Sequence, residues 1–341
     1  MKKIFAFLTI TILIITVIPT VSEGTNEEKL FDNTCTNNET EYYAIIAACS
    51  KYNDSRLNIP KFLPSFADWK LKIFYNELIE AKNWKKENVI LLLNEQATIK
   101  NITNAFDEMT NKVDEDDVFL FSWQGHGSKV QDTANDTNIG LDENDKFDET
   151  IDPYNCYRNK NGVLHNYITD DELNEMFSKI SADGQFIIFD CCYSGGIIED
   201  LKNKKRVLVA LTEEDNVGLA DLFIGFPMTE SLSIGLKDNL FEKQKDKNKN
   251  GFLSAEEIFN WSKPIVKTAT RSWLIECFMI NLLIARKTNT GGMKVFTSAF
   301  FSTVLGYITS QMVIYIRTGD FAKNSPHMVD RYEGELDLTE L

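Results

Sequence analysis

Two apolar segments that end in reactive side chains decide the fold of this chain. Residues 119–128 read Phe-Leu-Phe-Ser-Trp-Gln-Gly-His-Gly-Ser, and residues 185–196 read Gln-Phe-Ile-Ile-Phe-Asp-Cys-Cys-Tyr-Ser-Gly-Gly. Short apolar runs of this kind are typical of strands buried on both faces of a parallel sheet. Their carboxyl ends would bring His126 and Cys192 to one edge of the sheet, where open α/β sheets bind ligands.

Further strands and helices are predicted to alternate around these two segments. Apolar runs predict strands over 41–49, 89–93, 118–123 and 206–211. Helical spacing of apolar residues predicts helices over 63–82, 98–113 and 169–180, the last capped by Thr169 with Glu172 three residues on. The acidic segment 131–167 is expected to be a loop. This alternation predicts an α/β sandwich with a mostly parallel central sheet flanked by helices.

Composition and charge narrow the classes of function. The chain has 341 residues and a formal net charge of -15, which excludes nucleic acid as an expected partner because phosphates would be repelled. Six cysteines are few for this length, so disulfides are not expected to hold the fold together.

The N-terminus has the pattern of a secretory signal. Two lysines precede an uncharged stretch, and small residues follow it near residue 22. We therefore predict a signal peptide over 1–22, with an uncleaved membrane anchor as the alternative, and a polar leader over 23–40. Five glycosylation sequons agree with a secreted or extracytoplasmic location, at Asn38, Asn53, Asn101, Asn135 and Asn260.

An apolar insert is predicted near the C-terminus, over 265–320. Its part 295–316 is long enough to span a bilayer, yet it contains several Ser, Thr and Gln residues. The segment 273–317 is therefore expected to form a helical hairpin packed on the core or on another subunit, with a membrane-associated hairpin as the alternative.

The two strand ends together suggest a cysteine hydrolase. Either residue alone would more often be structural, since free cysteines and single histidines are commonly buried in cores. The chain has only three histidines, and His126 stands between two glycines at a strand end. A thiol beside an imidazolium becomes a thiolate, which is the nucleophile of such enzymes.

The residues around His126 and Cys192 resemble the two catalytic blocks of the caspase/metacaspase family of cysteine peptidases, and the metacaspase branch is the nearer. Supporting blocks occur in order, at 43–46, 66–68, 146–154 and 168–173. The resemblance covers about residues 40–260 and the tail 326–338, and it implies a caspase-like fold. Tyr193 replaces the usual His and Gln124 replaces a frequent Ser, which leaves the Cys–His pair intact.

The resemblance also implies roles for particular residues. Cys192 would be the nucleophile and His126 the acid/base, and the backbone N–H groups of Gly127 and Cys192 would form the oxyanion hole. Asp190 and Asp68 would line the S1 pocket and select Arg or Lys at P1, and Gln124 would lie near that pocket. Family zymogens are often cut between the nucleophile and the next strand, where the basic segment 202–206 is expected to be an exposed loop. The structural alternatives are a helix-capping acid at Asp190, a helix N-terminal acid at Asp68 and a solvated charge cluster at 202–206.

Two calcium sites are predicted. The resemblance maps the metacaspase site onto Asp148, Asp170, Asp171 and Glu199, although Asp170 and Asp171 would also suit a helix N-terminus without any metal. Residues 246–257 separately fit an EF-hand loop, with Gly251 at position six. Its expected ligands are Asp246, Asn248, Asn250, Phe252 and Glu257. A loop of this kind can also be only a structural turn.

These observations predict a secreted, calcium-stimulated and self-processing cysteine endopeptidase acting on polypeptides with a basic P1 residue, without an organic cofactor. The expected regions are 1–22, 23–40, a large-subunit region 41–200, a small-subunit region 201–264, the insert 265–320 and a tail 321–341. Membrane association through 273–317 or the N-terminal segment remains an alternative. Two functional alternatives stay open: a legumain- or clostripain-like peptidase with another P1 preference, and an inactive calcium-binding pseudopeptidase.

Overall fold

A six-stranded sheet forms the centre of the protein. In spatial order its members are β12 (His327–Asp330), β10 (Arg206–Ala210), β9 (Gly184–Asp190), β3 (Val118–Gln124), β1 (Tyr42–Ala48) and β2 (Trp84–Leu93). Neighbouring strands pair in parallel except for β12, which is antiparallel to β10. The strands β1, β3 and β9 are buried at every position, which explains why they appear in the sequence as continuous apolar runs. The predicted α/β class is confirmed.

This computed structural model describes residues 39–58, 68–131, 146–218, 225–237, 245–267, 278, 281–282, 292–318 and 322–341. The predicted signal peptide and nearly all of the polar leader lie outside these residues, as does much of the apolar insert.

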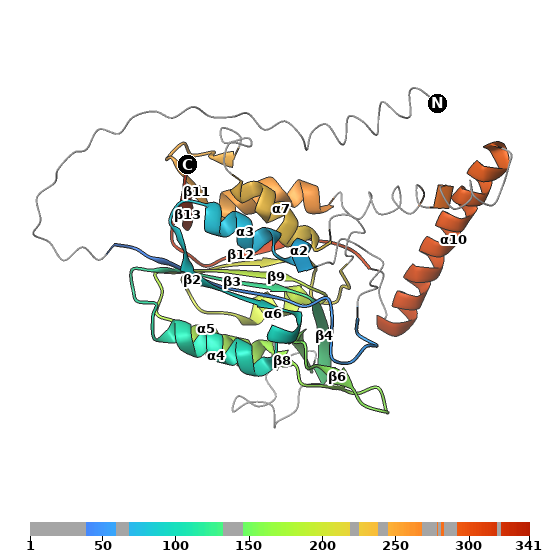
Figure 1. The fold of residues 1–341 in the computed structure, drawn as a ribbon, viewed down its shortest axis with the longest axis horizontal. Helices are drawn as coiled ribbons and strands as arrows, with labels where there is room; N and C mark the ends of the chain where they lie inside the picture. The colour runs from blue at the N-terminus through green and yellow to red at the C-terminus, as the bar shows by residue number, and fades with distance from the viewer. Residues whose placement is uncertain are drawn as a thin grey trace, which may run out of the picture. The chain divides into compact units, whose positions relative to one another are not determined.

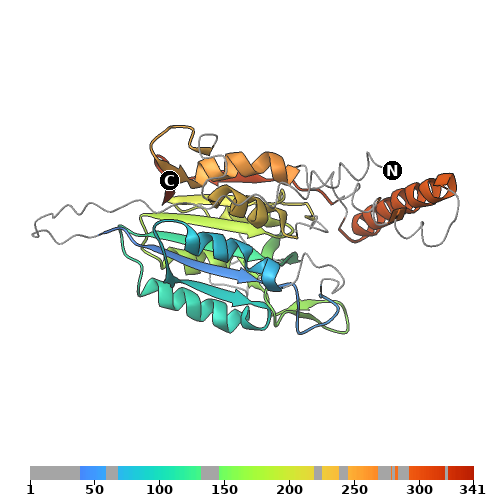
Figure 2. The ribbon, with the colours of Figure 1, turned by 45° about the horizontal axis from the view of Figure 1, so that its top comes forward.

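Helices cover both faces of the central sheet (Figures 1 and 2). On one face lie α4 (Ile99–Thr110), α5 (Asp170–Ser178) and α6 (Ser194–Asp200), and on the other lie α3 (Ile73–Glu80), α7 (Pro227–Leu236) and a helical segment over 255–267. On the first face Phe106, Phe121 and Phe177 contact one another, with ring centroids 5.1 to 5.3 Å apart. Each face therefore has its own apolar layer.

The helix termini follow the local sequence. Thr98 accepts a hydrogen bond from the N–H of Asn101 at 3.2 Å and starts α4. Thr169 and Glu172 form the predicted capping box at the start of α5. The described part of the helix predicted over 63–82 consists of two pieces, α2 (Asp68–Leu71) and α3, separated at Lys72. A short 3-10 turn, η2 (Asn94–Gln96), follows β2.

A second sheet of three antiparallel strands extends the site edge. It consists of β4 (His126–Gln131), β5 (Phe147–Asp152) and β8 (Ile168–Thr169), and a small hairpin of β6 (Tyr157–Arg158) and β7 (Leu164–His165) follows β5. The prediction of a loop over 131–167 is therefore wrong for these strands. Their acidic side chains hide the strand pattern, because several of them are buried against cations and hydroxyl groups rather than exposed to solvent.

The C-terminal part adds a strand pair and a long helix. The strand β11 (Phe252–Ser254) pairs with β13 (Asp337–Glu340), so the tail contacts the EF-hand-like loop. The helix α10 (Gly292–Thr318) lies in the predicted apolar insert. Among the helices of the described residues, none is both long enough and apolar enough to cross a bilayer.

Candidate active site

Parallel pairing of β3 with β9 brings the two predicted catalytic segments to one edge. Gln124 and Asp190, the last residues of the two strands, are register partners. His126 follows Gln124 by two residues, and Cys192 follows Asp190 by two residues. The carboxyl ends of these neighbouring strands therefore place His126 and Cys192 on the same edge of the sheet, as the sequence predicts.

His126 is held by contacts from the loop after β1. Its ring stacks on Tyr52 with a centroid separation of 5.1 Å, and its backbone N–H donates to the Tyr52 hydroxyl at 2.9 Å. The Nε2 atom lies 2.8 Å from the carbonyl oxygen of Leu57. A Cβ atom at Gly125 would lie 2.7 Å from the Trp123 ring, so the glycine before His126 is required by packing. The imidazole orientation is thus fixed by backbone and aromatic partners.

Cys192 lies in the turn between β9 and α6. Its Sγ is 3.9 Å from the carbonyl oxygen of Gly218. A Cβ atom at Gly127 would lie only 2.3 Å from the Cys192 carbonyl oxygen, so the backbone of the predicted oxyanion hole packs directly against the nucleophile turn. The neighbouring thiol of Cys191 is buried, which agrees with Cys192 as the reactive one.

The cysteine and histidine are adjacent by topology but are not joined in this state. No hydrogen bond links His126 to Cys192 within the described part of the chain. Burial raises the pKa of the Cys192 thiol to about 11, so the thiol is protonated at neutral pH. The thiolate–imidazolium pair that the sequence predicts is therefore not formed in this structure, where the thiol is protonated and His126 Nε2 contacts Leu57.

A buried carboxylate near the histidine was missed by sequence reasoning. Asp152 on β5 is the register partner of His126. It accepts hydrogen bonds from the hydroxyl groups of Ser128 at 2.7 Å and Thr150 at 2.9 Å. Its burial raises its pKa, and the charge of His126 opposes that effect. The only signal in the sequence was its place in the block 146–154.

Two of the three predicted S1 residues come together. Asp190 and Gln124 are both buried at adjacent strand ends. Asp190 Oδ2 accepts from the backbone N–H of Thr229 at 2.7 Å and from its hydroxyl at 2.9 Å, whereas no group in the described residues contacts Oδ1 with hydrogen-bond geometry. Burial raises the pKa of Asp190 to about 7. Asp190 is thus a fully buried acid that Thr229 holds through Oδ2.

Asp68 has a different environment. Its side chain is 54% exposed, and its Oδ1 pairs with Lys51 Nζ at 2.7 Å and accepts from Asn94 Nδ2 at 3.0 Å. Within the described residues no contact joins Asp68 to Asp190. The third predicted S1 residue is therefore already paired to a cation of this chain.

A cluster of three carboxylates lies behind the nucleophile turn. Single oxygen atoms of Glu149, Asp170 and Asp200 all lie within 4.8 Å of one another. Asp170 is fully buried, and its pKa is raised well above the usual range by burial and by the charges of Glu149, Asp200 and Asp148. A buried carboxyl whose charged form is opposed by neighbouring carboxylates fits a hard cation such as Ca²⁺.

This cluster shares Asp170 with the predicted calcium site but differs at the other positions. Glu149 replaces Asp148, and Asp200 replaces Glu199. Asp171 does not belong to the cluster, and its backbone N–H donates to Asp170 at 2.9 Å. In each case the cluster contains the residue next to the predicted one. Successive side chains point to opposite faces of β5 and are rotated by about 100° around α6. Sequence comparison alone does not determine which of two adjacent residues faces the cluster.

The EF-hand-like loop is formed locally. Asp246 accepts from the N–H groups of Lys249 and Gly251, and Gly251 has the positive φ of +85° that favours glycine. Asn248 and Asn250 each accept from the N–H two residues on, at 2.8 and 2.9 Å, and Phe252 starts β11. Glu257 Oε1 accepts from Lys247 at 2.5 Å. All five predicted positions thus lie within residues 246–257, and the side-chain oxygens of the four polar ones accept backbone N–H groups.

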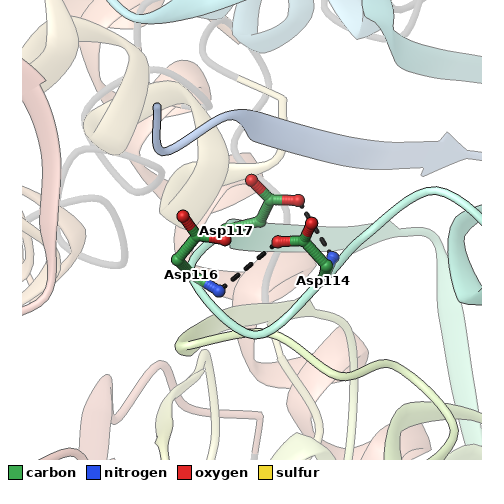
Figure 3. Close-up of side chains that lie close together, drawn as sticks. All are labelled: Asp114, Asp116 and Asp117. Carbon is green, nitrogen blue, oxygen red and sulfur yellow. Dashed lines mark hydrogen bonds between the residues drawn. The ribbon is translucent and has the colours of Figure 1, made fainter. Parts of the chain in front are cut away.

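A third acidic group has a structural explanation. Asp114, Asp116 and Asp117 form the turn before β3 (Figure 3), at the strand end opposite His126. Asp117 accepts from the N–H groups of Asp114 at 2.9 Å and Glu41 at 2.8 Å, and Asp114 accepts from Asp116 at 3.4 Å. These carboxylates cap a turn, and the catalytic edge lies at the other end of the strand.

The sheet and its edge define an α/β protein that presents a cysteine and a histidine together, which is the layout of a cysteine hydrolase. Residues 48–201 match a family model described as "Metacaspase, peptidase C14 domain". This match supports the predicted resemblance of the chain to the caspase/metacaspase family.

Known proteins are similar to parts of this chain. Metacaspase-4 of Arabidopsis thaliana is 29% identical over 136 residues, which are 38% of this chain and 29% of that protein. Metacaspase-8 of the same plant is 27% identical over 133 residues, covering 37% and 32%. The chain thus spans about a third of the length of these relatives. The structure of Caspase-1 from Spodoptera frugiperda aligns with 93% of this chain and 98% of its own, at 8% identity and a TM-score of 0.49.

Alkylation of Cys192 in the calcium-free protein should follow its high pKa. Only the thiolate reacts, so the rate with iodoacetamide should still rise about tenfold per pH unit from about pH 8 to 9.5. The alkylation rate of a thiol with an unperturbed pKa would begin to level off at about pH 8.5. The rate is measured by mass spectrometry of the peptide that carries Cys191 and Cys192, with Cys192→Ser as the blank. A plateau below pH 8 would contradict the buried resting thiol.

Proposed function

We propose that this chain is a cysteine endopeptidase in which Cys192 attacks the peptide carbonyl and His126 transfers the proton. The observation that carries the proposal is the register of β3 and β9, which brings both residues to one sheet edge with Gly127 against the nucleophile turn. The match of residues 48–201 to the metacaspase domain supports it.

The proposed reaction uses groups already positioned at this edge. After Cys192 loses its proton to His126, its sulfur adds to the scissile carbonyl carbon, and the backbone N–H groups of Gly127 and Cys192 stabilise the resulting oxyanion. His126 then donates the proton to the leaving amine. A water molecule, deprotonated by His126, hydrolyses the thioester and restores the thiol. The first step requires the imidazole to exchange the Leu57 carbonyl for the thiol.

We propose Arg or Lys at P1. Asp190 supports this choice, because a cationic P1 side chain would pair with its remaining oxygen and lower its raised pKa. A neutral P1 side chain would leave that buried oxygen unpaired. Gln124 beside Asp190 offers an amide in place of the small hydroxyl common in relatives.

We propose calcium as the activator, bound by Glu149, Asp170 and Asp200. Bound there, calcium supplies positive charge that neutralises three crowded carboxylates. The cluster lies next to α6, because a Cβ atom at Gly196 would be 2.0 Å from Glu149 Oε2. The loop 246–257 is proposed as a second, weaker site.

Secretion and self-processing complete the proposal. The signal-like N-terminus and the sequons support export. Lys202, Lys204 and Lys205 are exposed and suit cleavage after a basic residue. The prediction of an exposed loop is wrong for Arg206, which is 1% exposed and belongs to β10. Self-cleavage is therefore proposed at the lysines.

A pseudopeptidase is the second candidate, and two observations favour it: the thiol is protonated, and the imidazole contacts the Leu57 carbonyl. Labelling with an active-site probe separates the two functions. Labelling that requires Cys192 and increases with calcium supports the enzyme, whereas labelling independent of Cys192 supports the pseudopeptidase.

A P1 substrate panel tests the reaction and its specificity together. With calcium, the wild type should cleave after Arg and Lys, and Cys192→Ser and His126→Ala should each lose at least about a hundredfold in kcat/KM. Asp190→Asn should lose about a hundredfold on basic substrates, because the amide cannot pair with a cation. Strong cleavage after Asn or Asp with none after Arg would favour the legumain-like alternative.

Calcium binding should depend on the three clustered carboxylates. Asp170→Asn and Asp200→Asn should each weaken binding at this site by about tenfold or more, since each removes one charged ligand. Glu199→Gln is the matched control on α6 and should bind as the wild type does. Binding is measured by calorimetry in an Asp246→Asn, Glu257→Gln background, which silences the EF-hand-like loop. Equal losses for Glu199→Gln and Asp200→Asn would contradict this site.

Self-cleavage should require the exposed lysines alone. Substitution of Lys202, Lys204 and Lys205 by Ala should abolish the calcium-induced fragments, because no basic residue would remain accessible in that loop. Arg206→Gln is the control and should leave the fragments unchanged. Electrophoresis and terminal sequencing identify the cut, and fragments that persist in the triple variant would place the cleavage elsewhere.

A further inference from the structure

One lysine joins the carboxylate cluster to the loop that covers the nucleophile. Lys129 lies on β4 directly opposite Glu149 on β5. Its Nζ is 3.0 Å from Glu149 Oε1, 2.8 Å from Asp215 Oδ1 and 3.8 Å from Glu214 Oε1. The Glu149 side chain is 2% exposed, whereas those of Glu214 and Asp215 are 41% and 78% exposed. Lys129 thus forms a bridge between one buried carboxylate, Glu149, and two solvent-exposed carboxylates, Glu214 and Asp215.

The loop 213–218 packs on the turn that carries Cys192. The N–H of Tyr193 donates to the carbonyl of Asn216 at 2.9 Å, and the carbonyl of Gly218 is 3.9 Å from Cys192 Sγ. A Cβ atom at Gly195 would lie 2.4 Å from the backbone nitrogen of Glu214. This loop therefore lies against the Cys192 thiol and contributes to its burial.

The ion pairs at the two ends of the Lys129 bridge differ in strength. Ion pairs with exposed carboxylates contribute little by themselves, because water and salt screen them. The pair with buried Glu149 is screened far less. Glu149 therefore gives the Lys129 ammonium group a buried anchor, from which it reaches Glu214 and Asp215.

We propose that Lys129 is a positioning residue that couples calcium binding to release of the loop 213–218. This inference rests on the proposed calcium-activated peptidase. In the calcium-free protein the Lys129 ammonium neutralises Glu149 and tethers the loop over Cys192. When calcium binds the same carboxylate, repulsion between the two cations weakens the Lys129–Glu149 pair, and the loop loses its buried anchor.

Linkage makes this coupling measurable from both sides. If calcium weakens the tether, the tether weakens calcium binding by the same factor. Lys202 provides a matched comparison, since its Nζ pairs with Asp200 Oδ1 at 2.8 Å but it lies outside the loop that covers the nucleophile. A lysine that only neutralises the cluster and a lysine that also tethers the loop can thus be distinguished.

The experiment measures calcium affinity by calorimetry and Cys192 alkylation by iodoacetamide, in the Asp246→Asn, Glu257→Gln background. Lys129→Met should bind calcium about tenfold more tightly, within the range typical of coupled sites. Without calcium, its alkylation rate should rise to that of the calcium-loaded parent. Lys202→Met should also bind calcium more tightly but keep the slow calcium-free alkylation. Lys129→Arg should behave as the parent, because it retains the cation.

A second variant guards against misfolding of Lys129→Met, which thermal unfolding would reveal. Glu214→Gln with Asp215→Asn removes the tether from the loop side, so it should accelerate calcium-free alkylation and, by linkage, tighten calcium binding, though less than Lys129→Met does because the Lys129 ammonium stays beside Glu149. The proposal is overturned if Lys129→Met binds calcium no more tightly than the parent, or if Lys129→Met and Lys202→Met accelerate alkylation equally. If both shifts occur while no peptide is cleaved, the coupling stands and the proposed peptidase function fails.

Discussion

The parallel pairing of β3 with β9 is the constraint on which the site depends. Because Gln124 lies opposite Asp190, the residues two positions beyond them meet at one edge whatever the connecting segments do. A slip of one residue would turn the buried side chains of either strand to the opposite face. The separate apolar layers on the two faces oppose such a slip, since each layer accepts only its own set of side chains.

The same constraint explains how much of the molecule the sequence could predict. The central strands appear as continuous apolar runs because they are covered on both faces, and Thr169 with Glu172 marks the start of α5 through a local hydrogen-bond pattern. His126, Cys192 and Asp190 were identifiable because they follow such runs directly. Local patterns and burial therefore define the sheet and the residues at its edge.

Features that depend on pairing between distant acidic segments could not be predicted in this way. The segment that forms β5 contains Asp148, Glu149 and Asp152, a composition typical of a loop. It forms a strand because Lys129 and the hydroxyl of Ser128 on β4 face these acids once the ladder forms. For the same reason Glu149 rather than Asp148 joins the carboxylate cluster, since the strand's alternation decides which side chain faces α6. The Leu57 contact to His126 involves a backbone carbonyl, which no residue identity reveals.

Under the proposed function, burial acts in opposite directions on P1 selection and on the nucleophile. It would make Asp190 a selective partner for a cation, because an unpaired carboxylate is unfavourable there. It also raises the pKa of Cys192 to about 11 and so suppresses the nucleophile. To combine P1 selectivity with a thiol that is unreactive at rest, the proposed enzyme must expose the Cys192 thiol while Asp190 stays buried. Asp190 is covered by Thr229 on α7, whereas Cys192 is covered by the loop 213–218. Two different segments thus cover the two groups, so the thiol can become exposed while Asp190 stays covered by Thr229.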